Sequence, residues 1–286
     1  MSPSSSENTV VPMDGKWHVD PSNPMNMVRY LEAWYPPGIS ETDMLWGGNT
    51  AKLVRLEDGT VLKYVWDRDD RRAKNCLEVE HSILSALGDH ERIVKYLGKH
   101  EHGLRFQLAA NGDVRRYLSS HDASESPEHL RRKWARQAAE ALAFVHDKGV
   151  IHSDIHPNNF LLDEHLDILL CDFAGSLFGT LDGGAMESVR FFLPRDPLAT
   201  PDAKSDLFAL GSTMFFIMSD HEPYNDLADE EVAARFSRLE YPDVRNYACG
   251  RVIEGCWKGE FGSAQEVVEA FSGDFVGGRH DLAETE

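Results

Sequence analysis

The feature of this 286-residue chain that most constrains its fold is a single change of hydrophobic pattern near Ala110. Between Met44 and Ala110, short apolar runs are separated by turn signals and interrupted by one helical repeat. After Ala110, the apolar residues recur mostly at helical spacing. Strands and helices that are segregated along a chain form separate layers or lobes. The pattern therefore predicts an α+β fold with a small sheet-rich lobe and a larger helical lobe.

The smaller lobe is expected to hold two hairpins with a helix between them. Residues 51–65 form two apolar runs around the turn signal Asp58-Gly59, and residues 91–109 supply two further runs. Residues 67–87 instead place apolar side chains at helical spacing, which predicts a helix of about four turns.

The larger lobe is expected to be mostly helical. A long helix should begin with Ser126 as its N-cap and Pro127 at its first helical position, and it should stop at Gly149. Residues 204–220 are apolar nearly all round, which predicts a central buried helix. Residues 160–171, between these two helices, have the pattern of another hairpin.

These patterns divide the chain into segments. We expect a tail at residues 1–40, lobes at about 41–110 and 111–276, and a second tail at 277–286. A short helical piece is predicted in the first tail around Met27–Trp34, ended by two prolines. The junction between the lobes is where we expect a ligand.

The charge of the chain argues against nucleic acid as a partner. The chain has 29 Lys and Arg against 48 Asp and Glu, a net charge of −19. Such a surface repels phosphate backbones. A basic protein partner is compatible with the acidic excess, although solubility alone explains it.

Targeting signals and cysteines indicate an intracellular protein. The chain has no apolar run of about eighteen residues, so we expect no contact with a membrane, and its N-terminus lacks the pattern of a secretory signal. Cys76, Cys171, Cys249 and Cys256 are scattered without metal-binding spacing, which is typical of reduced thiols. We expect a cytoplasmic location, with the nucleus left open.

The stretch HSDIHPNNFLLDEHLDILLCDFAGS, residues 152–176, carries the chemistry that we expect between the lobes. Phosphoryl transfer from ATP needs a carboxylate that orients the attacking hydroxyl, oxygen ligands for Mg²⁺, and a cation for the α- and β-phosphates. Asp154 can be the carboxylate. Asn159 and Asp172 are oxygen ligands suited to Mg²⁺.

The cation and its partner come from the smaller lobe. Lys63 lies in the middle of the strand VLKYV, where it can reach phosphates. Glu80 lies on the apolar face of the following helix, where a carboxylate is rarely buried without a partner. We therefore expect Glu80 to pair with Lys63 and to fix its position.

These residues stand in motifs that resemble those of eukaryotic-type protein kinases. HSDIHPNN resembles the catalytic loop H-R-D-L-x-x-x-N, and CDFAG resembles the metal-binding D-F-G turn. VLKYV is similar to the V-A-I-K strand, Glu80 to the regulatory-helix glutamate, and KSDLFALGS to the buried helix whose Asp206 braces the catalytic loop. The motifs keep their order across residues 44–272, and in style they are most like small fungal-type kinase-like proteins.

The resemblance implies a bilobal protein-kinase-like fold, with a small antiparallel sheet and one helix in the first lobe. It implies an ATP- and Mg²⁺-dependent serine/threonine kinase that transfers the γ-phosphate to hydroxyls of a protein substrate. Its catalytic residues would be Asp154, Lys63 and Glu80, and its metal ligands Asn159 and Asp172. Its nucleotide contacts would be Gly47, Val54, Lys63, the backbone from Gln107 to Ala109, Asn159 and Asp172, with Phe106 behind the adenine.

The chain departs from the family pattern at several positions. The phosphate-covering loop reads G-G-N-T-A-K-L-V, in which only Gly47 matches G-x-G-x-x-G-x-V. Ser153 replaces the Arg that pairs with a phosphorylated activation segment, so we expect no control by that route. RFFLPRD lacks the Glu of A-P-E, so the ion pair that this Glu makes in the helical lobe is either absent or rebuilt.

Two other interpretations stay open. The degenerate loop, Ser153 and the missing Glu favour a pseudokinase, a binding or scaffold module without catalysis, although the five phosphoryl-transfer residues are all present. His156 stands where serine/threonine kinases carry a γ-phosphate-binding Lys. It favours a small-molecule phosphotransferase of the aminoglycoside and choline kinase type. The sequence indicates neither the protein substrate nor the oligomeric state.

Overall fold

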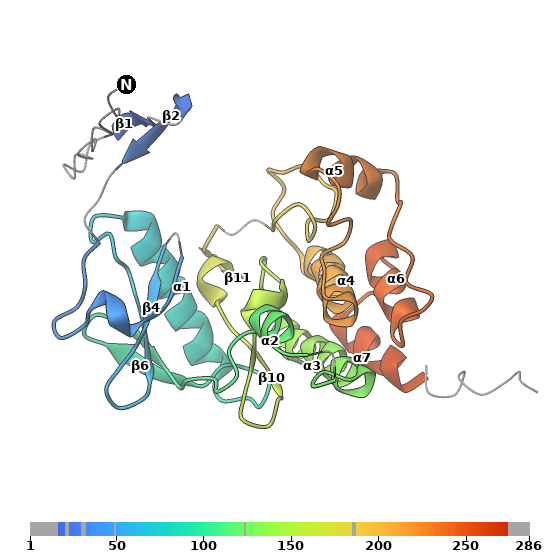
Figure 1. Cartoon of the computed structure of the whole chain (residues 1–286), viewed down its shortest axis with the longest axis horizontal. Coiled ribbons are helices and arrows are strands. Elements are labelled where there is room, and N and C mark those ends of the chain that lie inside the picture. The colour runs from blue at the N-terminus through green and yellow to red at the C-terminus, as the bar shows by residue number, and fades with distance from the viewer. Residues whose placement is uncertain are drawn as a thin grey trace, which may run out of the picture.

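The structure is a computed structural model, and it describes residues 17–20, 23–29, 33–48, 50–122, 124–184 and 187–273. These residues form a smaller lobe built on a five-stranded sheet and a larger, mostly helical lobe (Figure 1). The predicted bilobal α+β fold is therefore confirmed. No helix in these ranges is long and apolar enough to cross a membrane.

The smaller lobe consists of an antiparallel sheet, in the strand order β3-β4-β5-β7-β6, and one long helix. Its strands are β3 (Met44–Gly47), β4 (Lys52–Arg55), β5 (Val61–Tyr64), β6 (Tyr96–His100) and β7 (Gly103–Phe106). Helix α1 (Arg71–Leu87) begins after Asp70, whose side chain accepts a hydrogen bond from the N–H of Ala73. Both predicted hairpins and the predicted helix are present.

The two faces of this sheet have different partners because side chains alternate along a strand. In the β4–β5 pair, Leu53 lies opposite Lys63, and Val54 lies opposite Leu62. Val54, Leu62 and Tyr64 form a buried cluster on one face, which we call the outer cluster. Lys63 lies on the other face, where it contacts α1. This alternation decides which residues of β4 share a face with Lys63.

The segment that precedes the sheet packs on the outer cluster. Trp34 and Tyr35 lie against that cluster, and the N–H of Trp34 donates to the carbonyl of Trp66 at 3.2 Å. The ring of Trp34 meets Tyr64 edge to face, with centroids 5.8 Å apart. Residues 33–40 are therefore part of the folded lobe rather than a tail.

The short helix predicted around Met27–Trp34 is wrong where the structure describes it. Met27 lies in strand β2 (Asn23–Arg29), which pairs with β1 (Trp17–Asp20), and Trp34 is not helical. Residues 30–32 lie outside the described residues. Burial of the Trp34 ring against the sheet outweighs local helix propensity, which is a weak preference.

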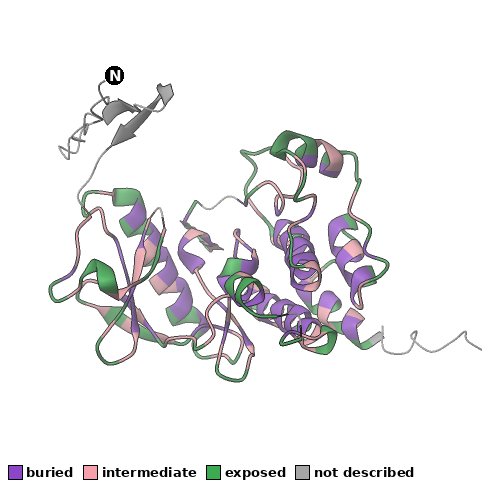
Figure 2. Cartoon of the chain, in the orientation of Figure 1, coloured by how far each residue is buried: buried purple, intermediate pink, exposed green. Residues whose placement is uncertain are grey.

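The larger lobe packs its helices around α3 (Glu128–Asp147) and α4 (Ala203–Ser219). Helix α4 is buried without interruption from Ser205 to Ile217, as its apolar sequence predicts (Figure 2). The other helices are α2 (Val114–Ser120), α5 (Asp229–Ser237), α6 (Gly250–Lys258) and α7 (Ala264–Gly273).

The ends of α3 differ in how well they were predicted. Gly149 follows the helix with φ at +76°, so the predicted stop is confirmed. The predicted start is wrong by one residue, since Pro127 is the N-cap. Ser126 does not cap the helix because its buried hydroxyl accepts a hydrogen bond from Nη2 of Arg131 at 3.0 Å.

Short strand pairs hold the loops between the lobes. The strands are β8 (Val150–Ile151), β9 (Phe160–Leu162), β10 (Ile168–Leu170), β11 (Leu177–Phe178) and β12 (Leu181–Asp182). Strand β9 pairs with β10, and β11 pairs with both β8 and β12. Figure 1 shows β10 and β11 between the two lobes. These pairings bring the loop 152–159 beside the loop 171–176.

Candidate active site

Lys63 is the point at which elements of the two lobes meet. Its Nζ lies 2.6 Å from Oε2 of Glu80 in α1 and 2.7 Å from Oδ1 of Asp172, which follows β10. The side chains of Lys63 and Glu80 are buried, whereas that of Asp172 is 35% exposed. The structure thus contains the predicted ion pair of Lys63 with Glu80, and it adds Asp172 as a second partner.

The charges of these three groups follow from their burial and their proximity. Burial lowers the pKa of Lys63. The carboxylates of Asp172 and Glu80 raise it by more than burial lowers it, so the pKa of Lys63 lies above its usual value. Burial raises the pKa of Asp172. The charge of Lys63 and its hydrogen bond lower it by more, so the pKa of Asp172 lies below its usual value. Burial raises the pKa of Glu80, and Lys63 offsets this only in part. Asp172 is therefore the firmer anionic partner of Lys63.

The loop that carries Asp154 is fixed by the buried helix α4. The carboxylate of Asp206 accepts hydrogen bonds from the backbone N–H groups of His152 and Ser153, each at 2.8 Å. Nε2 of His146 lies 2.9 Å from the same carboxylate. The contact is the one that the resemblance implies for Asp206, and it holds the two residues that precede Asp154.

Asp154 presents a carboxylate that is 34% exposed. Its Oδ2 lies 3.5 Å from Nε2 of His156. The other ring nitrogen, Nδ1, accepts a hydrogen bond from the N–H of Asn158 at 3.3 Å, which leaves Nε2 to face Asp154. A partly exposed carboxylate held in this way can accept the proton of a hydroxyl group.

Asn159 and Asp172 lie at neighbouring ends of the β9–β10 hairpin. The N–H of Cys171 donates to the carbonyl of Asn159 at 2.9 Å. The next residue, Asp172, has a left-handed backbone with φ at +65°. The N–H of Phe173 then donates to Oε1 of Glu80 at 3.3 Å, so the turn after Asp172 is tied to α1.

The donor set at this point fits a magnesium ion. Nδ2 of Asn159 donates to the carbonyl of Asp154 at 2.8 Å, which leaves the amide oxygen as an acceptor. This oxygen and the carboxylate of Asp172 are the ligand types of Mg²⁺ sites that water and phosphate oxygens complete. In the described part of the chain, no group of three or more His, Cys, Asp or Glu side chains could hold a metal.

The segment that joins the lobes has backbone groups available for a heterocycle. The N–H of Gln107 donates to the carbonyl of Lys95 at 3.0 Å. Within the described ranges, the carbonyl of Gln107 and the N–H of Ala109 have no hydrogen-bond partner. An acceptor and a donor two residues apart are the groups that we expect to bind adenine. Phe106, just before them in β7, is buried.

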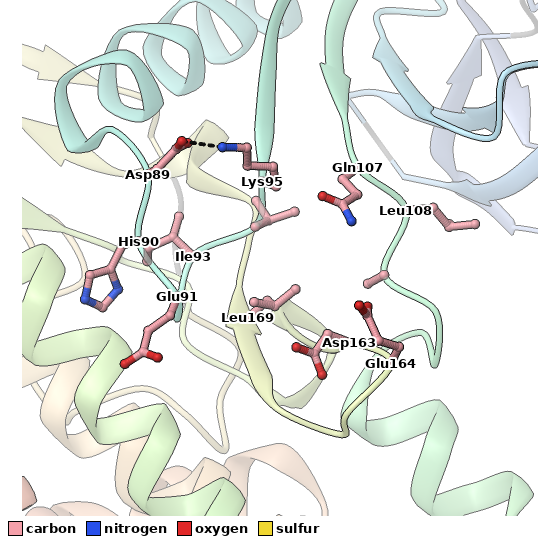
Figure 3. A pocket seen from close by; sticks show the side chains of 12 residues that line it. Asp89, His90, Glu91, Ile93, Lys95, Gln107, Leu108, Asp163, Glu164 and Leu169 are labelled. Atoms are coloured by element: carbon pink, nitrogen blue, oxygen red, sulfur yellow. Dashed lines mark hydrogen bonds and ion pairs between the residues drawn. The ribbon is translucent and has the colours of Figure 1, made fainter.

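A pocket of about 380 Å³ lies beside the same segment. It is lined by residues between Asp89 and Lys95, by the β9–β10 hairpin and by the segment itself. Figure 3 shows the side chain of Gln107 pointing into this pocket and that of Leu108 pointing away. Neither Lys63 nor any acidic residue of the predicted site lines it, so the pocket is distinct from the phosphoryl-transfer residues.

The structure places Val54 apart from the other residues that we predict to contact the nucleotide. It is fully buried in the outer cluster, on the face away from Lys63. Leu53 lies opposite Lys63 and shares its face. The prediction counted forward from Gly47 along the glycine pattern. Counting back from Lys63 across the hairpin selects Leu53 instead.

The phosphate-covering loop is closed tightly around its first glycines. Gly47 ends β3 opposite Lys52, and the N–H of Gly48 donates to the carbonyl of Ala51 at 2.9 Å. Lys52 stands where the pattern has a glycine. Its Nζ lies 3.3 Å from the hydroxyl of Tyr35 on the outer face. The Lys52 side chain is therefore turned away from Lys63.

RFFLPRD lacks the Glu of A-P-E, but its Arg195 forms an ion pair with a residue just before this segment. Nη2 of Arg195 lies 2.9 Å from Oε2 of Glu187, whose side chain is 1% exposed. The guanidinium also lies over the ring of Phe192, 4.4 Å from its centroid. The sequence offered no signal for this pair beyond opposite charges eight residues apart.

Comparison with known proteins identifies the family. Residues 48–248, which are more than half of the chain, match the family described as "Protein kinase domain". The chain therefore belongs to the protein kinase domain family. The match runs from the smaller lobe into the larger one and contains Lys63, Glu80, Asp154, Asn159 and Asp172, while α6 and α7 lie beyond it.

Individual relatives are similar at low identity. A putative mitogen-activated protein kinase kinase kinase 7-like protein of Drosophila melanogaster is 26% identical over 196 residues, which cover 63% of this chain and 48% of the relative. CBL-interacting protein kinase 22 of Oryza sativa subsp. japonica is 31% identical over 172 residues, 54% of this chain and 38% of the relative. Aurora kinase of Patiria pectinifera is 28% identical over 168 residues, 53% of this chain and 39% of the relative. The chain thus spans about half or less of the length of these relatives.

Proposed function

We propose that this chain is an ATP- and Mg²⁺-dependent protein kinase that phosphorylates serine or threonine hydroxyls of a protein. The observation that carries the proposal is the position of Lys63, which is ion-paired with both Glu80 and Asp172. A buried ammonium held by two carboxylates has the charge and the fixed geometry that a phosphate clamp needs. Two further relatives, one of Dictyostelium discoideum and one of Mus musculus, are named as serine/threonine-protein kinases, and these names support the choice of acceptor.

Each residue of the site has a proposed role. The oxygen of the incoming hydroxyl attacks the γ-phosphorus, its proton passes to the carboxylate of Asp154, and the bond to the β-phosphate breaks to release ADP. Lys63 orients the α- and β-phosphates, and Glu80 fixes Lys63. Asn159 and Asp172 would hold Mg²⁺, which neutralises charge on the phosphates when bound. The backbone of Gln107 and Ala109 would bind the adenine.

The test is transfer of labelled γ-phosphate from ATP to a generic basic protein mixture. Wild type should label protein, and Asp154→Asn should lower the rate by about a thousandfold while ATP binding persists. The matched control is Asp226→Asn, an exposed carboxylate outside the site, which should keep the wild-type rate. Equal labelling by wild type and Asp154→Asn would contradict the role of Asp154.

One observation favours the second candidate, a pseudokinase that binds partners without catalysis. The N–H of Gly48 donates to the carbonyl of Ala51, so it is not available to donate to a phosphate. The side chain of Lys52 is turned to the outer face, away from the place where phosphates would bind. Absence of labelling by wild type, with protein or with small hydroxyl and amino acceptors, would support this candidate. Labelling of the small acceptors alone would support the small-molecule phosphotransferase instead.

A further inference from the structure

Three side chains near the start of α1 donate hydrogen bonds to three consecutive backbone carbonyls, that of the last residue of β12 and those of the two residues after it. Nη2 of Arg72 donates to the carbonyl of Gly184 at 3.0 Å, and Nδ2 of Asn75 donates to that of Asp182 at 3.3 Å. Sγ of Cys76 donates to the carbonyl of Gly183 at 3.3 Å. We call Arg72, Asn75 and Cys76 the α1 clasp.

The carbonyls that the α1 clasp holds belong to backbone packed against the turn after Asp172. The N–H of Gly183 donates to the carbonyl of Ser176 at 3.1 Å. A Cβ on Gly183 would lie 2.0 Å from the carbonyl oxygen of Ala174 and 2.6 Å from Cα of Gly175. No side chain fits there, so the backbone of residue 183 touches the turn directly. The clasp therefore joins α1 to that turn.

Glu80 lies one helical turn from the α1 clasp and is itself attached to the turn after Asp172. Cys76 and Glu80 are four residues apart on one face of α1, and both are buried. Cys76 holds that face to Gly183, and Oε1 of Glu80 accepts the N–H of Phe173. A shift of α1 that separates Glu80 from Lys63 must break these hydrogen bonds.

The α1 clasp makes no use of a phosphate group. Its acceptors are backbone carbonyls, and Ser153 supplies no positive charge to the neighbouring loop. In the segment from Ser176 to about Arg195, which corresponds to the activation segment of kinases, Thr180 and Ser188 are exposed hydroxyls. Among the described residues, neither hydroxyl contacts Arg72, Asn75 or Cys76.

We propose that Arg72, Asn75 and Cys76 are positioning residues that hold Glu80 against Lys63, so that the phosphate clamp assembles without modification of the activation segment. The catalytic readout of this proposal rests on the proposed kinase function. The structural readout, the protection of the Phe173 N–H, does not. The failure of one proposal can therefore be told apart from the failure of the other.

The test compares two double variants on the same turns of α1. Arg72→Ala/Asn75→Ala removes two donors of the clasp, and Arg71→Ala/Lys74→Ala alters two exposed residues that make no such contact. Hydrogen exchange is followed by mass spectrometry in peptides that span α1 and residues 172–184. Each lost hydrogen bond shifts the opening equilibrium by about fivefold. Exchange should thus be about twenty-fivefold faster in the first variant, which loses two hydrogen bonds, and unchanged in the second.

Kinetics separate a positioning role from a purely structural one. Arg72→Ala/Asn75→Ala should lower kcat by about threefold or more, with the KM for protein substrate changed by less than about twofold. Cys76→Ala should act in the same direction. Thr180→Ala/Ser188→Ala should keep the wild-type kcat, because the clasp does not use these hydroxyls.

Three results would overturn the proposal. The first is an unchanged rate of exchange at residues 172–184 in Arg72→Ala/Asn75→Ala. The second is a wild-type kcat in that variant although its exchange is faster. The third is loss of activity in Thr180→Ala/Ser188→Ala. If wild type transfers no phosphate, the exchange result alone decides. Faster exchange at Phe173 then upholds the clasp, and only the kinase function fails.

Discussion

Oδ1 of Asp206 lies 2.8 Å from the backbone N–H of Ser153, and the two residues are 53 positions apart in the sequence. Ser153 has φ at +66°, a left-handed conformation that costs a non-glycine residue about 1 kcal/mol. The hydrogen bond from Ser153 and its neighbour from His152 therefore hold a strained backbone just before Asp154. Helix α4 holds the loop that carries Asp154 through this carboxylate.

Asp206→Asn should consequently destabilise the fold and lower activity together. The amide keeps one acceptor oxygen and turns its NH₂ group toward a second backbone donor, which leaves a buried N–H without a partner. We expect a loss of about 2 kcal/mol in the free energy of unfolding. Urea unfolding followed by circular dichroism measures this loss. The control Asp226→Asn, an exposed residue, should change it by less than about 0.5 kcal/mol.

The alternation along β4 gives opposite expectations for two adjacent residues. Leu53→Ala should raise the KM for ATP by about fivefold, since Leu53 shares the face of Lys63 and loses apolar contact. Val54→Ala should leave that KM unchanged and lower the free energy of unfolding by about 2 kcal/mol, because it opens a cavity in the outer cluster. Steady-state kinetics and urea unfolding of both variants are the measurements. The reverse pattern would restore Val54 as the nucleotide contact.

Much of this fold could be predicted because its strongest signals are local. Residues 204–220 are apolar on every side, the turn Asp58-Gly59 separates two apolar runs, and Gly149 ends α3. The packing of Trp34 on the outer cluster could not be predicted. Its partner strands lie farther along the chain, and no local periodicity records a contact of that range.

The candidate site was predictable as a set of residue types and less so as a geometry. Lys63, Glu80 and Asp172 stand in motifs whose order is visible in the sequence. The face of Val54 depends on the register across the β4–β5 turn, which a shift of one residue reverses. The α1 clasp was invisible because its acceptors are backbone carbonyls, which any sequence supplies.

The ion pairs of Lys63 with Glu80 and Asp172 predict how activity depends on pH. The pKa of Glu80 is raised above 4.5, so the folded protein binds this proton at higher pH than the unfolded chain does. Proton uptake there does not weaken the fold, because the folded state is the better proton acceptor. The pKa of Asp172 is lowered below 3.8, so its contribution to stability is complete above that pH and is lost as the pH falls through the folded value.

Activity should therefore fall with decreasing pH before the protein unfolds, as Glu80 is neutralised and Lys63 loses one partner. The measurement is kcat/KM for ATP over a pH series, with circular dichroism at each pH. In Glu80→Gln, kcat/KM for ATP should reach a lower plateau and should lack the fall at acidic pH. This result would assign the fall to Glu80 rather than to His156 or Asp154. An unchanged fall in Glu80→Gln would assign the titration to another group.

The ion pair of Arg195 and Glu187 should contribute to stability as a unit. Either Glu187→Ala or Arg195→Ala leaves a largely buried charge without its partner, which should cost about 3 kcal/mol in the free energy of unfolding. The double variant should cost less than the sum of the two, with a coupling of about 1–3 kcal/mol. Urea unfolding of the four proteins in this cycle provides the measurement. Additive losses would show that the two side chains act separately.

Gly183→Ala tests the direct contact between the activation segment and the turn after Asp172. The new methyl group would meet the carbonyl oxygen of Ala174 at 2.0 Å, and that oxygen belongs to backbone, so one of the two segments must move. We expect kcat to fall by about tenfold and the free energy of unfolding to fall by about 2 kcal/mol. Thr180→Ala, three residues earlier and exposed, should change neither quantity. A Gly183→Ala variant with wild-type kcat would show that Asp172 keeps its position when this contact is displaced.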